Sequence, residues 1–260
     1  GYIASNFYNN PSTKLKLIGI TGTNGKTTTV TLLHQMFRQI GYHTGLISTI
    51  VNKIDEKEIP STHTTPDAIN LNKLLWQMVD NGCEYCFMEV SSHSIVQNRI
   101  GGLEFFGGIF SNITHDHLDF HKTFAEYISA KKTFFDNLPS SAFALTNIDD
   151  RNGQVMLQNT KAKKYTYSIQ EIADFKGKIL ENTFQGILIN INGKDVWTRL
   201  VGKFNASLKL LSQLEEEAKE QNTSMFEIIS KGKELIFKEL ILHLTKESEN
   251  LSLTELIELI

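Results

Sequence analysis

The feature that most constrains this chain is a glycine-rich loop between an apolar run and an amphipathic one. The apolar run at residues 14–20 predicts a strand, and apolar side chains on one face from Val30 to Ile40 predict a helix after the loop. Between them stands TGTNGKTT, residues 21–28. Glycines let backbone N–H groups turn inward around phosphate oxygens, and the helix N-terminus adds the positive end of its dipole. The loop therefore predicts a nucleotide-phosphate site, with Lys26 on the β- and γ-phosphates and the Thr27 hydroxyl on Mg²⁺.

Strands and helices alternate along the front part of the chain. Further strands are predicted at 45–51, 83–90, 107–113 and 142–148, and further helices at 65–82 and 123–138. Such alternation is typical of an α/β fold whose ligands bind beyond the carboxyl ends of parallel strands. We therefore expect an α/β fold with a mostly parallel sheet and a nucleotide-binding P-loop, followed by a short β-rich segment and a helical tail.

The composition changes near Ala206. Residues 207–260 hold 11 Glu and 6 Lys without Asp or Arg, a net charge of −5, together with 12 Leu and 6 Ile. This segment predicts helices with an apolar packing stripe that covers the preceding domain or mediates self-association. The stripe comprises Leu208, Leu211, Leu214, Phe226, Ile229, Leu235 and Ile236. The predicted domains are a linker remnant at 1–13, a central domain at 14–206 and a tail of unrecognised type at 207–260.

Charge, hydropathy and cysteine content exclude several classes of protein. A chain of 260 residues with net charge −3 lacks the basic footprint of a nucleic-acid-binding protein. No apolar run approaches the ~18 residues of a membrane span, and we expect neither a signal peptide nor a membrane partner. Cys83 and Cys86 are expected on opposite faces of a strand, as core thiols that neither pair nor share a metal. Two cysteines cannot staple a fold of this size, which indicates a reducing, cytoplasmic setting.

Two further motifs follow predicted strands. Glu89, in MEVSSH at 88–93, ends a buried strand beside the phosphate loop and is a natural Mg²⁺ ligand; the alternative is a carboxylate that points to solvent. The second motif, HDHLDFH at 115–121, brings three histidines together at a spacing that can bind zinc. Paired cysteines are absent, and Mg²⁺ at a phosphate site prefers oxygen ligands, so the histidine cluster alone decides nothing.

Several motifs in order resemble the central domain of the Mur ligases, the ATP-dependent amide ligases that build the peptide of bacterial peptidoglycan. The loop TGTNGKTT has Ile20 where the generic P-loop pattern has its first glycine, and the shift to Gly22 is similar to this family's own version. The motifs HTTP at 63–66, EVSSH at 89–93, FSNI at 110–113, DHLD at 116–119 and SAK at 129–131 continue the family order. The resemblance covers residues 2–206.

The resemblance implies roles for individual residues. ATP would lie on Gly22, Thr23, Asn24, Gly25, Lys26, Thr27 and Thr28. Thr27 would bind a first Mg²⁺, Glu89 and His117 would hold a second metal ion, and the catalytic residues would be Lys26, His117 and Lys131. Lys131 matches the family's carbamylated lysine, whose carbamate supplies oxygen ligands. A nucleotide-linked substrate would lie on Thr64, Thr65, Ser91, Gln97 and Arg99. The guanidinium of Arg99 suits an anionic peptide because it can bind two oxygens at once.

The activity that the resemblance implies is ATP-dependent amide ligation in the synthesis of peptidoglycan precursors. A diamino acid, meso-diaminopimelate or lysine, would be added to UDP-N-acetylmuramoyl-L-alanyl-D-glutamate through an acyl phosphate. Two alternatives remain: an isolated module that binds ATP without ligase activity, and a folylpolyglutamate-synthase-like ligase, which shares the loop but should lack TTP and EVSSH. Residues 1–13 and 207–260 carry no motifs of the family's outer domains. We therefore expect slow amide formation by the chain alone, since positioning can be worth ~7–11 kcal/mol of barrier.

Overall fold

The computed structural model describes residues 1–114, 118–183, 186–191 and 193–198. The chain divides into two compact units, Gly1–Thr166 and Tyr167–Ile260. The predicted boundary at residue 206 and the predicted helical tail lie outside the described residues, so both stay predictions.

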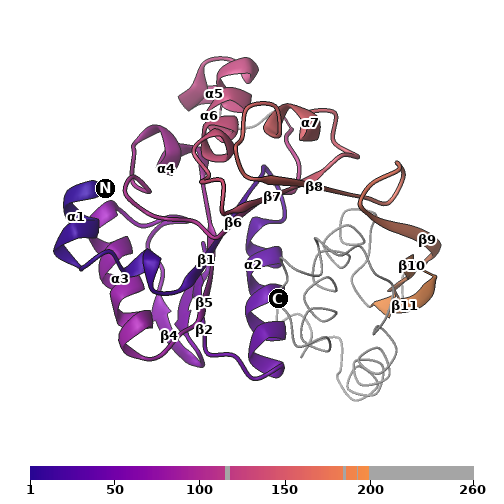
Figure 1. Cartoon of the computed structure of the whole chain (residues 1–260). Coiled ribbons are helices and arrows are strands. Elements are labelled where there is room, and N and C mark those ends of the chain that lie inside the picture. Colours follow the sequence, from indigo (N-terminus) through magenta and orange to yellow (C-terminus); the bar gives the residue numbers. More distant parts are fainter. Residues whose placement is uncertain (115–117, 184–185, 192, 199–260) are drawn as a thin grey trace. The chain divides into compact units, whose positions relative to one another are not determined.

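The first unit is built on a sheet with β1 (Lys16–Thr21) at its centre (Figure 1). The strand order is β7-β6-β1-β5-β2-β3-β4. Its parallel members besides β1 are β2 (Thr44–Ile47), β5 (Tyr85–Glu89), β6 (Gly107–Phe110) and β7 (Phe143–Asn147). An antiparallel hairpin of β3 (Val51–Ile54) and β4 (Lys57–Pro60) forms the edge beyond β2. The prediction of a mostly parallel α/β sheet is confirmed.

Helices connect and cover these strands. The long ones are α2 (Lys26–Gln39), α3 (Ala68–Asp80) and α6 (Phe124–Asp136). The short ones are α1 (Tyr2–Phe7), a 3₁₀ turn (Pro11–Thr13), α4 (Ser92–Val96), α5 (Leu118–His121) and α7 (Gly153–Met156). In Figure 1, α2 lies on one side of β1, β5 and β2, and α3 lies on the other. The sheet is therefore covered on both faces.

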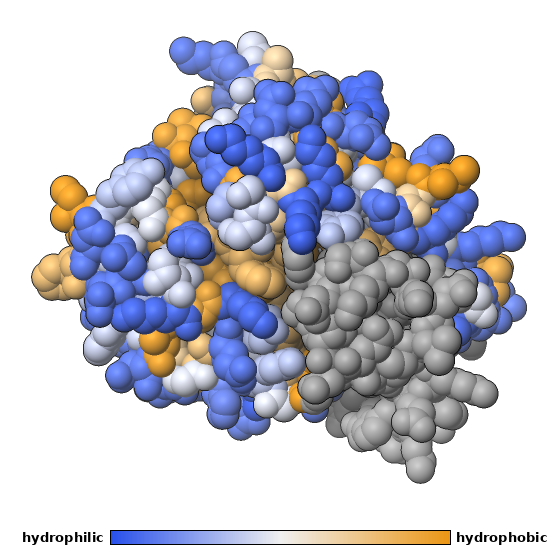
Figure 2. All heavy atoms as spheres, viewed as in Figure 1, coloured by the Kyte–Doolittle hydropathy of each residue, from blue (hydrophilic) through white to orange (hydrophobic). Residues whose placement is uncertain are grey.

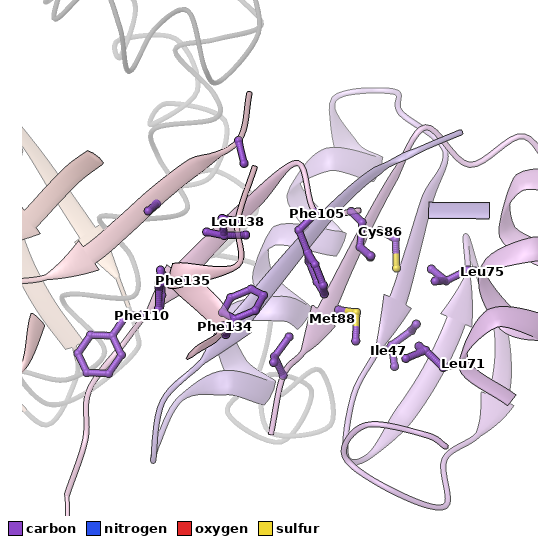
Figure 3. Close-up of a cluster of buried hydrophobic side chains, with 14 of the residues drawn as sticks. Ile47, Leu71, Leu75, Cys86, Met88, Phe105, Phe110, Phe134, Phe135 and Leu138 are labelled. Atoms are coloured by element: carbon purple, nitrogen blue, oxygen red, sulfur yellow. The ribbon is translucent and has the colours of Figure 1, made fainter. Parts of the chain in front are cut away.

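Burial on both faces explains why the central strands are apolar throughout. On the α2 side, the ring of Phe37 lies 4.7 Å from that of Phe87 on β5. On the opposite side, Leu71 and Leu75 of α3 face the sheet residues Cys86 and Met88, as Figure 3 shows. The cluster continues toward α6 through Phe105, Phe134, Phe135 and Leu138. Each such side chain stabilises the fold by about 1.5–3 kcal/mol on burial.

Side-chain caps mark where two of the long helices, α3 and α6, begin. The Asp67 carboxylate accepts hydrogen bonds from the N–H groups of Ile69 and Asn70, so α3 begins at Ala68, three residues later than predicted. Thr123 caps α6 in the same way through the N–H of Glu126. The predicted helices at 65–82 and 123–138 are otherwise confirmed.

The prediction of one strand at 45–51 is wrong. The strand β2 ends at Ile47, and the chain turns through Ser48 before β3 begins at Val51. The Ser48 hydroxyl donates to the Val51 carbonyl over 2.6 Å and accepts from the Val51 N–H over 3.2 Å. A serine that bonds the backbone three residues on supports a turn at the expense of a continuous strand.

The two cysteines are buried and unpaired, which confirms the prediction of core thiols. Burial raises the pKa of Cys83 to about 12 and raises the pKa of Cys86 well above its ordinary value. Both thiols are therefore protonated at neutral pH and serve as small apolar side chains.

The second unit contains an antiparallel meander of β9 (Phe175–Thr183), β10 (Gly186–Ile191) and β11 (Lys194–Thr198). The strand β8 (Lys163–Ser168) crosses the division between the units. Along β10, Ile187, Ile189 and Ile191 are buried and alternate with less buried residues, which is the period of a strand with one covered face. The predicted short β-rich segment is confirmed.

The described surface is mainly hydrophilic on the face drawn in Figure 2, with small hydrophobic patches, one of them over α1. The exposed apolar residues of α1 are Tyr2, Ile3 and Phe7. Within the part of the chain that the structure describes, no helix has the length and apolar character needed to cross a membrane.

The buried His34 on α2 makes the stability of the fold depend on pH. Burial lowers the pKa of His34 to about 4, and the nearby positive charges of Arg38 and Lys53 contribute to the lowering. In the unfolded chain the His34 imidazole takes up a proton near pH 6.5, whereas in the folded chain it takes up that proton only near pH 4. The stabilisation is fully present above pH 6.5 and is lost as the pH falls toward 4, by about 3 kcal/mol in total.

We expect urea unfolding at pH 7 and pH 4.5 to show this loss in the wild type and a smaller one in His34→Leu. The exposed His63 provides the control, and His63→Gln should keep the wild-type pH dependence. Equal pH dependence in the wild type and in His34→Leu would contradict the assignment to His34.

Candidate functional site

The phosphate loop comprises residues 21–28, which run from the end of β1 into the first turn of α2. Gly25 has φ 80°, a left-handed conformation that favours glycine, and it precedes the first residue of the helix. A Cβ atom on Gly22 would overlap the hydroxyl of Ser111, so only glycine lets the loop approach the neighbouring strand end this closely. The predicted order of strand, glycine loop and helix is confirmed.

Residues after β6 clamp the loop from the side. The Asn112 side chain accepts from the Asn24 N–H over 3.0 Å and donates to the Asn24 carbonyl over 3.1 Å. Its backbone carbonyl accepts from the Thr23 N–H over 2.8 Å. Ser111 adds a bond from its hydroxyl to the Asn24 carbonyl over 2.8 Å. The loop is therefore held in shape by a neighbouring strand end.

The clamp rests in turn on residues at the end of β7 and in the segment after it. The Asn147 amide donates to the Ser111 carbonyl over 2.9 Å, and the Asp150 carboxylate accepts from the Ile113 N–H over 2.7 Å. Sequence reasoning did not single out Asn147 and Asp150, nor give Asn112 a role in the site. The available signal was their position, since each polar residue lies at the end of a strand or shortly after it, at the carboxyl edge of the sheet.

The Lys26 ammonium lies folded over the loop. It donates to the carbonyl of Gly22 over 3.0 Å and to that of Thr23 over 2.9 Å. The positive charge of Lys26 therefore lies at the loop, close to the backbone N–H groups between β1 and α2. A phosphate in that loop would meet both the charge and the positive end of the helix dipole.

The Glu89 carboxylate, at the end of β5, is 1% exposed, so the alternative in which it points to solvent is wrong. Its Oε1 accepts from the Thr27 hydroxyl over 2.8 Å and from the Thr49 N–H over 2.7 Å. Its Oε2 accepts from the Thr49 hydroxyl over 3.2 Å. These bonds satisfy a charge that would otherwise be costly to bury. Thr49 is a contact that sequence reasoning missed.

The residues expected to hold the substrate lie beside Glu89. The buried Thr65 donates from its hydroxyl to the Glu89 carbonyl over 2.8 Å and accepts from the Ser91 N–H over 3.2 Å. Arg99 donates to the Thr65 carbonyl over 2.8 Å and to the Gln97 side chain over 2.8 Å. The HTTP motif, EVSSH and the segment after it thus meet as one group, although Thr65 and Ser91 are 26 positions apart along the chain.

The Lys131 side chain is 1% exposed and points inward from α6 to the phosphate loop, as its helical face predicts. Its ammonium nitrogen lies 2.9 Å from the Gly22 carbonyl, to which it donates, and 4.6 Å from the centre of the Tyr127 ring. The Tyr127 hydroxyl lies 3.2 Å from that of Thr23. Lys131 and Tyr127 therefore support the loop from α6, whereas Glu89 contacts it from β5.

His117 lies outside the described residues, together with His115 and Asp116, so its predicted metal role stays a prediction. Among the residues that the structure does describe, no group of three His, Cys, Asp or Glu side chains could hold a metal ion. The pair of Thr27 and Glu89 offers hydroxyl and carboxylate oxygens 2.8 Å apart at the loop. Oxygen donors beside a phosphate loop fit Mg²⁺ better than zinc.

The clamp by Asn112 gives a direct prediction. Asn112→Ala removes both side-chain bonds to Asn24, and we expect a loss of about 1–3 kcal/mol in the free energy of unfolding. Amide hydrogen exchange at Asn24 should also become faster, because its N–H loses its acceptor. The control is Asn81→Ala, which removes one exposed bond to the Gln77 carbonyl at the end of α3. Unchanged exchange at Asn24 in Asn112→Ala would show that other contacts hold the loop.

Comparison with known proteins places this chain in a family. A UDP-N-acetylmuramoyl-L-alanyl-D-glutamate--2,6-diaminopimelate ligase from Cytophaga hutchinsonii is 65% identical over 206 residues, covering 79% of this chain and 42% of the relative. A solved structure of a ligase with the same name matches with 28% identity and a TM-score of 0.71, over 85% of this chain and 46% of the other. The chain thus spans less than half the length of these relatives.

A solved structure of folylpolyglutamate synthase from Mycobacterium tuberculosis, complexed with ADP and AMPPCP, also matches, with a TM-score of 0.62 and 14% identity. The match covers 80% of this chain and 56% of that protein. A sequence identity of 14% shows a shared fold alone. The family model of the Mur ligase middle domain matches residues 20–212. With the loop, the buried Glu89 and the two motifs beside it in place, the chain belongs to the Mur ligase family.

Proposed function

We propose that this chain provides the nucleotide site and part of the substrate site of an ATP-dependent ligase. The reaction joins 2,6-diaminopimelate to UDP-N-acetylmuramoyl-L-alanyl-D-glutamate, as the names of its similar relatives state for those proteins. The observation that carries the proposal is the position of Glu89. Its buried carboxylate bonds Thr27 of the phosphate loop, and its backbone carbonyl accepts from Thr65 of the HTTP motif. The nucleotide side and the substrate side therefore meet at one residue.

Residues 22–28 hold the phosphates of ATP in this proposal. The loop N–H groups and the helix N-terminus bind phosphate oxygens, and the Lys26 ammonium leaves the Gly22 and Thr23 carbonyls to meet the transferring phosphate. Thr27 would supply an oxygen ligand for a first Mg²⁺, and Glu89, His117 and a carbamylated Lys131 would supply ligands for a second metal ion. The positive charges neutralise the transferring group, which is most of what phosphoryl transfer requires.

The substrate side binds the nucleotide-linked dipeptide. Thr64 and Ser91 offer hydroxyl groups, Gln97 offers an amide, and the Arg99 guanidinium binds an anionic peptide group. Arg99 is fixed by its bonds to Thr65 and Gln97, so little side-chain freedom is lost when it binds. HTTP and EVSSH are both present and in contact, which favours this substrate class over a folate.

The bound ATP supplies a phosphoryl group that turns an unreactive carboxylate into an acyl donor for the incoming amine. The chain's own residues hold the carboxylate and the phosphate near each other, because Thr65 and Thr27 both bond Glu89. Holding reactants in position in this way lowers the barrier of an otherwise bimolecular step.

The proposal is tested by phosphate release from ATP with Mg²⁺. We expect the chain to bind ATP and to release phosphate faster when UDP-N-acetylmuramoyl-L-alanyl-D-glutamate is added. Mass spectrometry after addition of diaminopimelate or lysine then measures how fast, if at all, each tripeptide product forms. ATP binding that never responds to the dipeptide nucleotide would instead support an isolated ATP-binding module.

Replacement of Lys26 tests the loop itself. Lys26→Ala removes a charged contact to phosphate, and we expect Mg-ATP binding to weaken by ~1.5–3 kcal/mol in calorimetric titration. The matched control is Lys73→Ala, which removes an exposed lysine of α3. Equal affinity of the wild type and Lys26→Ala for Mg-ATP would contradict the assignment of the loop.

We also predict that Lys131 is carbamylated in bicarbonate buffer. Carbon dioxide adds to a neutral amine with release of a proton, and a buried amine beside carbonyl and hydroxyl oxygens is held out of bulk water. With ¹³C-bicarbonate, a carbamate signal should appear in the ¹³C NMR spectrum of the wild type and be absent from Lys131→Ala. The neighbouring Lys132, paired with Asp136 at 2.6 Å, gives the control Lys132→Ala, which should keep the signal. Persistence of the signal in Lys131→Ala, or its absence from the wild type, would rule the prediction out.

A further inference from the structure

Thr49, in the turn after β2, touches both sides of the site through one hydroxyl. That hydroxyl lies 3.0 Å from the Thr64 hydroxyl and 3.2 Å from Glu89 Oε2. The backbone N–H of the same residue donates to Glu89 Oε1 over 2.7 Å. We propose that Thr49 is a positioning residue that couples substrate binding at Thr64 to cation binding at Glu89. The inference rests on the proposed function.

The turn that carries Thr49 is fixed before any ligand binds. The Ser48 N–H donates to the Asn52 side chain over 3.3 Å, and the Ser48 hydroxyl bonds both polar groups of the Val51 backbone. The Ser61 hydroxyl donates to the Ser48 carbonyl over 2.7 Å. Ser48 and Asn52 are buried, whereas Thr49 is exposed at the tip of the turn. Thr49 is therefore held firmly at a point that a ligand can approach.

The coupling follows from counting protons. A threonine hydroxyl carries one proton, so Thr49 donates to Thr64 or to Glu89 Oε2, but not to both at once. In the ligand-free chain Thr49 is the donor in both contacts, so its one proton alternates between the Thr64 hydroxyl and Glu89 Oε2. When an oxygen of the substrate accepts the Thr64 proton, the Thr64 oxygen becomes a stronger acceptor, because hydrogen bonds in a chain polarise one another, and the Thr49 hydroxyl turns to donate to Thr64.

This rearrangement releases one oxygen of Glu89. Within the described part of the chain, Oε2 accepts from the Thr49 hydroxyl alone, whereas Oε1 accepts from Thr27 and from the Thr49 N–H. Once the Thr49 hydroxyl turns away, Oε2 has lone pairs available for a cation while Oε1 stays anchored. Substrate at Thr64 and Mg²⁺ at Glu89 therefore favour each other, and by linkage the coupling acts equally in both directions.

The test measures the affinity for Mg²⁺ with and without the dipeptide nucleotide. Calorimetry uses the full chain with a non-hydrolysable ATP analogue and UDP-N-acetylmuramoyl-L-alanyl-D-glutamate as the probe. We expect the dipeptide nucleotide to tighten Mg²⁺ binding about fivefold or more in the wild type, as is typical of coupled sites. Thr49→Val removes the hydroxyl but keeps the shape of the side chain, and it should reduce this factor to near one. Thr49→Ser restores the hydroxyl and should restore the factor.

Two further variants distinguish the loss of the hydrogen bonds among Thr64, Thr49 and Glu89 from a general loss of structure. Thr64→Val should also abolish the coupling, and adding it to Thr49→Val should change nothing more, because both variants break the same chain of bonds. The control Thr133→Val removes an exposed hydroxyl that donates to the Ser129 carbonyl on α6, and it should keep the wild-type factor. Undiminished coupling in Thr49→Val would overturn the inference.

A crystal structure of ligand-free Thr49→Val gives a readout that does not depend on ligand binding. We expect the Glu89 carboxylate to rotate about its anchored Oε1 once Oε2 loses its donor, so that Oε2 leaves the position it holds in the wild type. An unmoved Glu89 would overturn the positioning role of Thr49. Failure of the wild type to bind either nucleotide would instead refute the proposed function, while the orientation of Glu89 still decides the role of Thr49.

Discussion

The buried carboxylate of Glu89 is the constraint around which the site is organised. A charge that is 1% exposed has to be met by donors, and the donors come from two different connections of the sheet, the Thr27 hydroxyl of the phosphate loop and Thr49 after β2. Because β5 pairs with both β1 and β2, the ends of these strands bring the donors to the same place. The Glu89 carboxylate therefore links the phosphate loop to the part of the sheet where the HTTP motif lies.

The opposite flank of the loop depends on hydrogen bonds from two asparagine side chains and one lysine. Asn112 holds Asn24 on the β6 side, and Asn147 supports that clamp from the next strand. Lys131 reaches the Gly22 carbonyl from α6. The loop thus takes its shape from several neighbouring strand ends and one helix, which keeps its backbone ordered at the point where a phosphate would lie.

Much of the site was predictable from the sequence, because it follows from the order of the strands, loops and helices along the chain and from the spacing of their apolar residues. A strand, a glycine loop and a helix in sequence predict a phosphate site, and residues placed after strands predict a shared edge. The inward direction of Lys131 followed from its helical face. The position of β3 was not predicted, since the break in the strand comes from a local bond between Ser48 and Val51 that competes with strand pairing.

The sequence by itself determined the α/β class, the phosphate loop and the motifs of the family, because local propensity, periodicity and residue order carry that information. Only the tertiary structure decided that Glu89 is buried, that Thr49 binds it, and that Asn112 clamps the loop. These contacts join residues 40 to 88 positions apart, and no local pattern specifies which polar side chains meet across strand ends. Strand order and register bring them together, and both are set by burial on the two faces of the sheet.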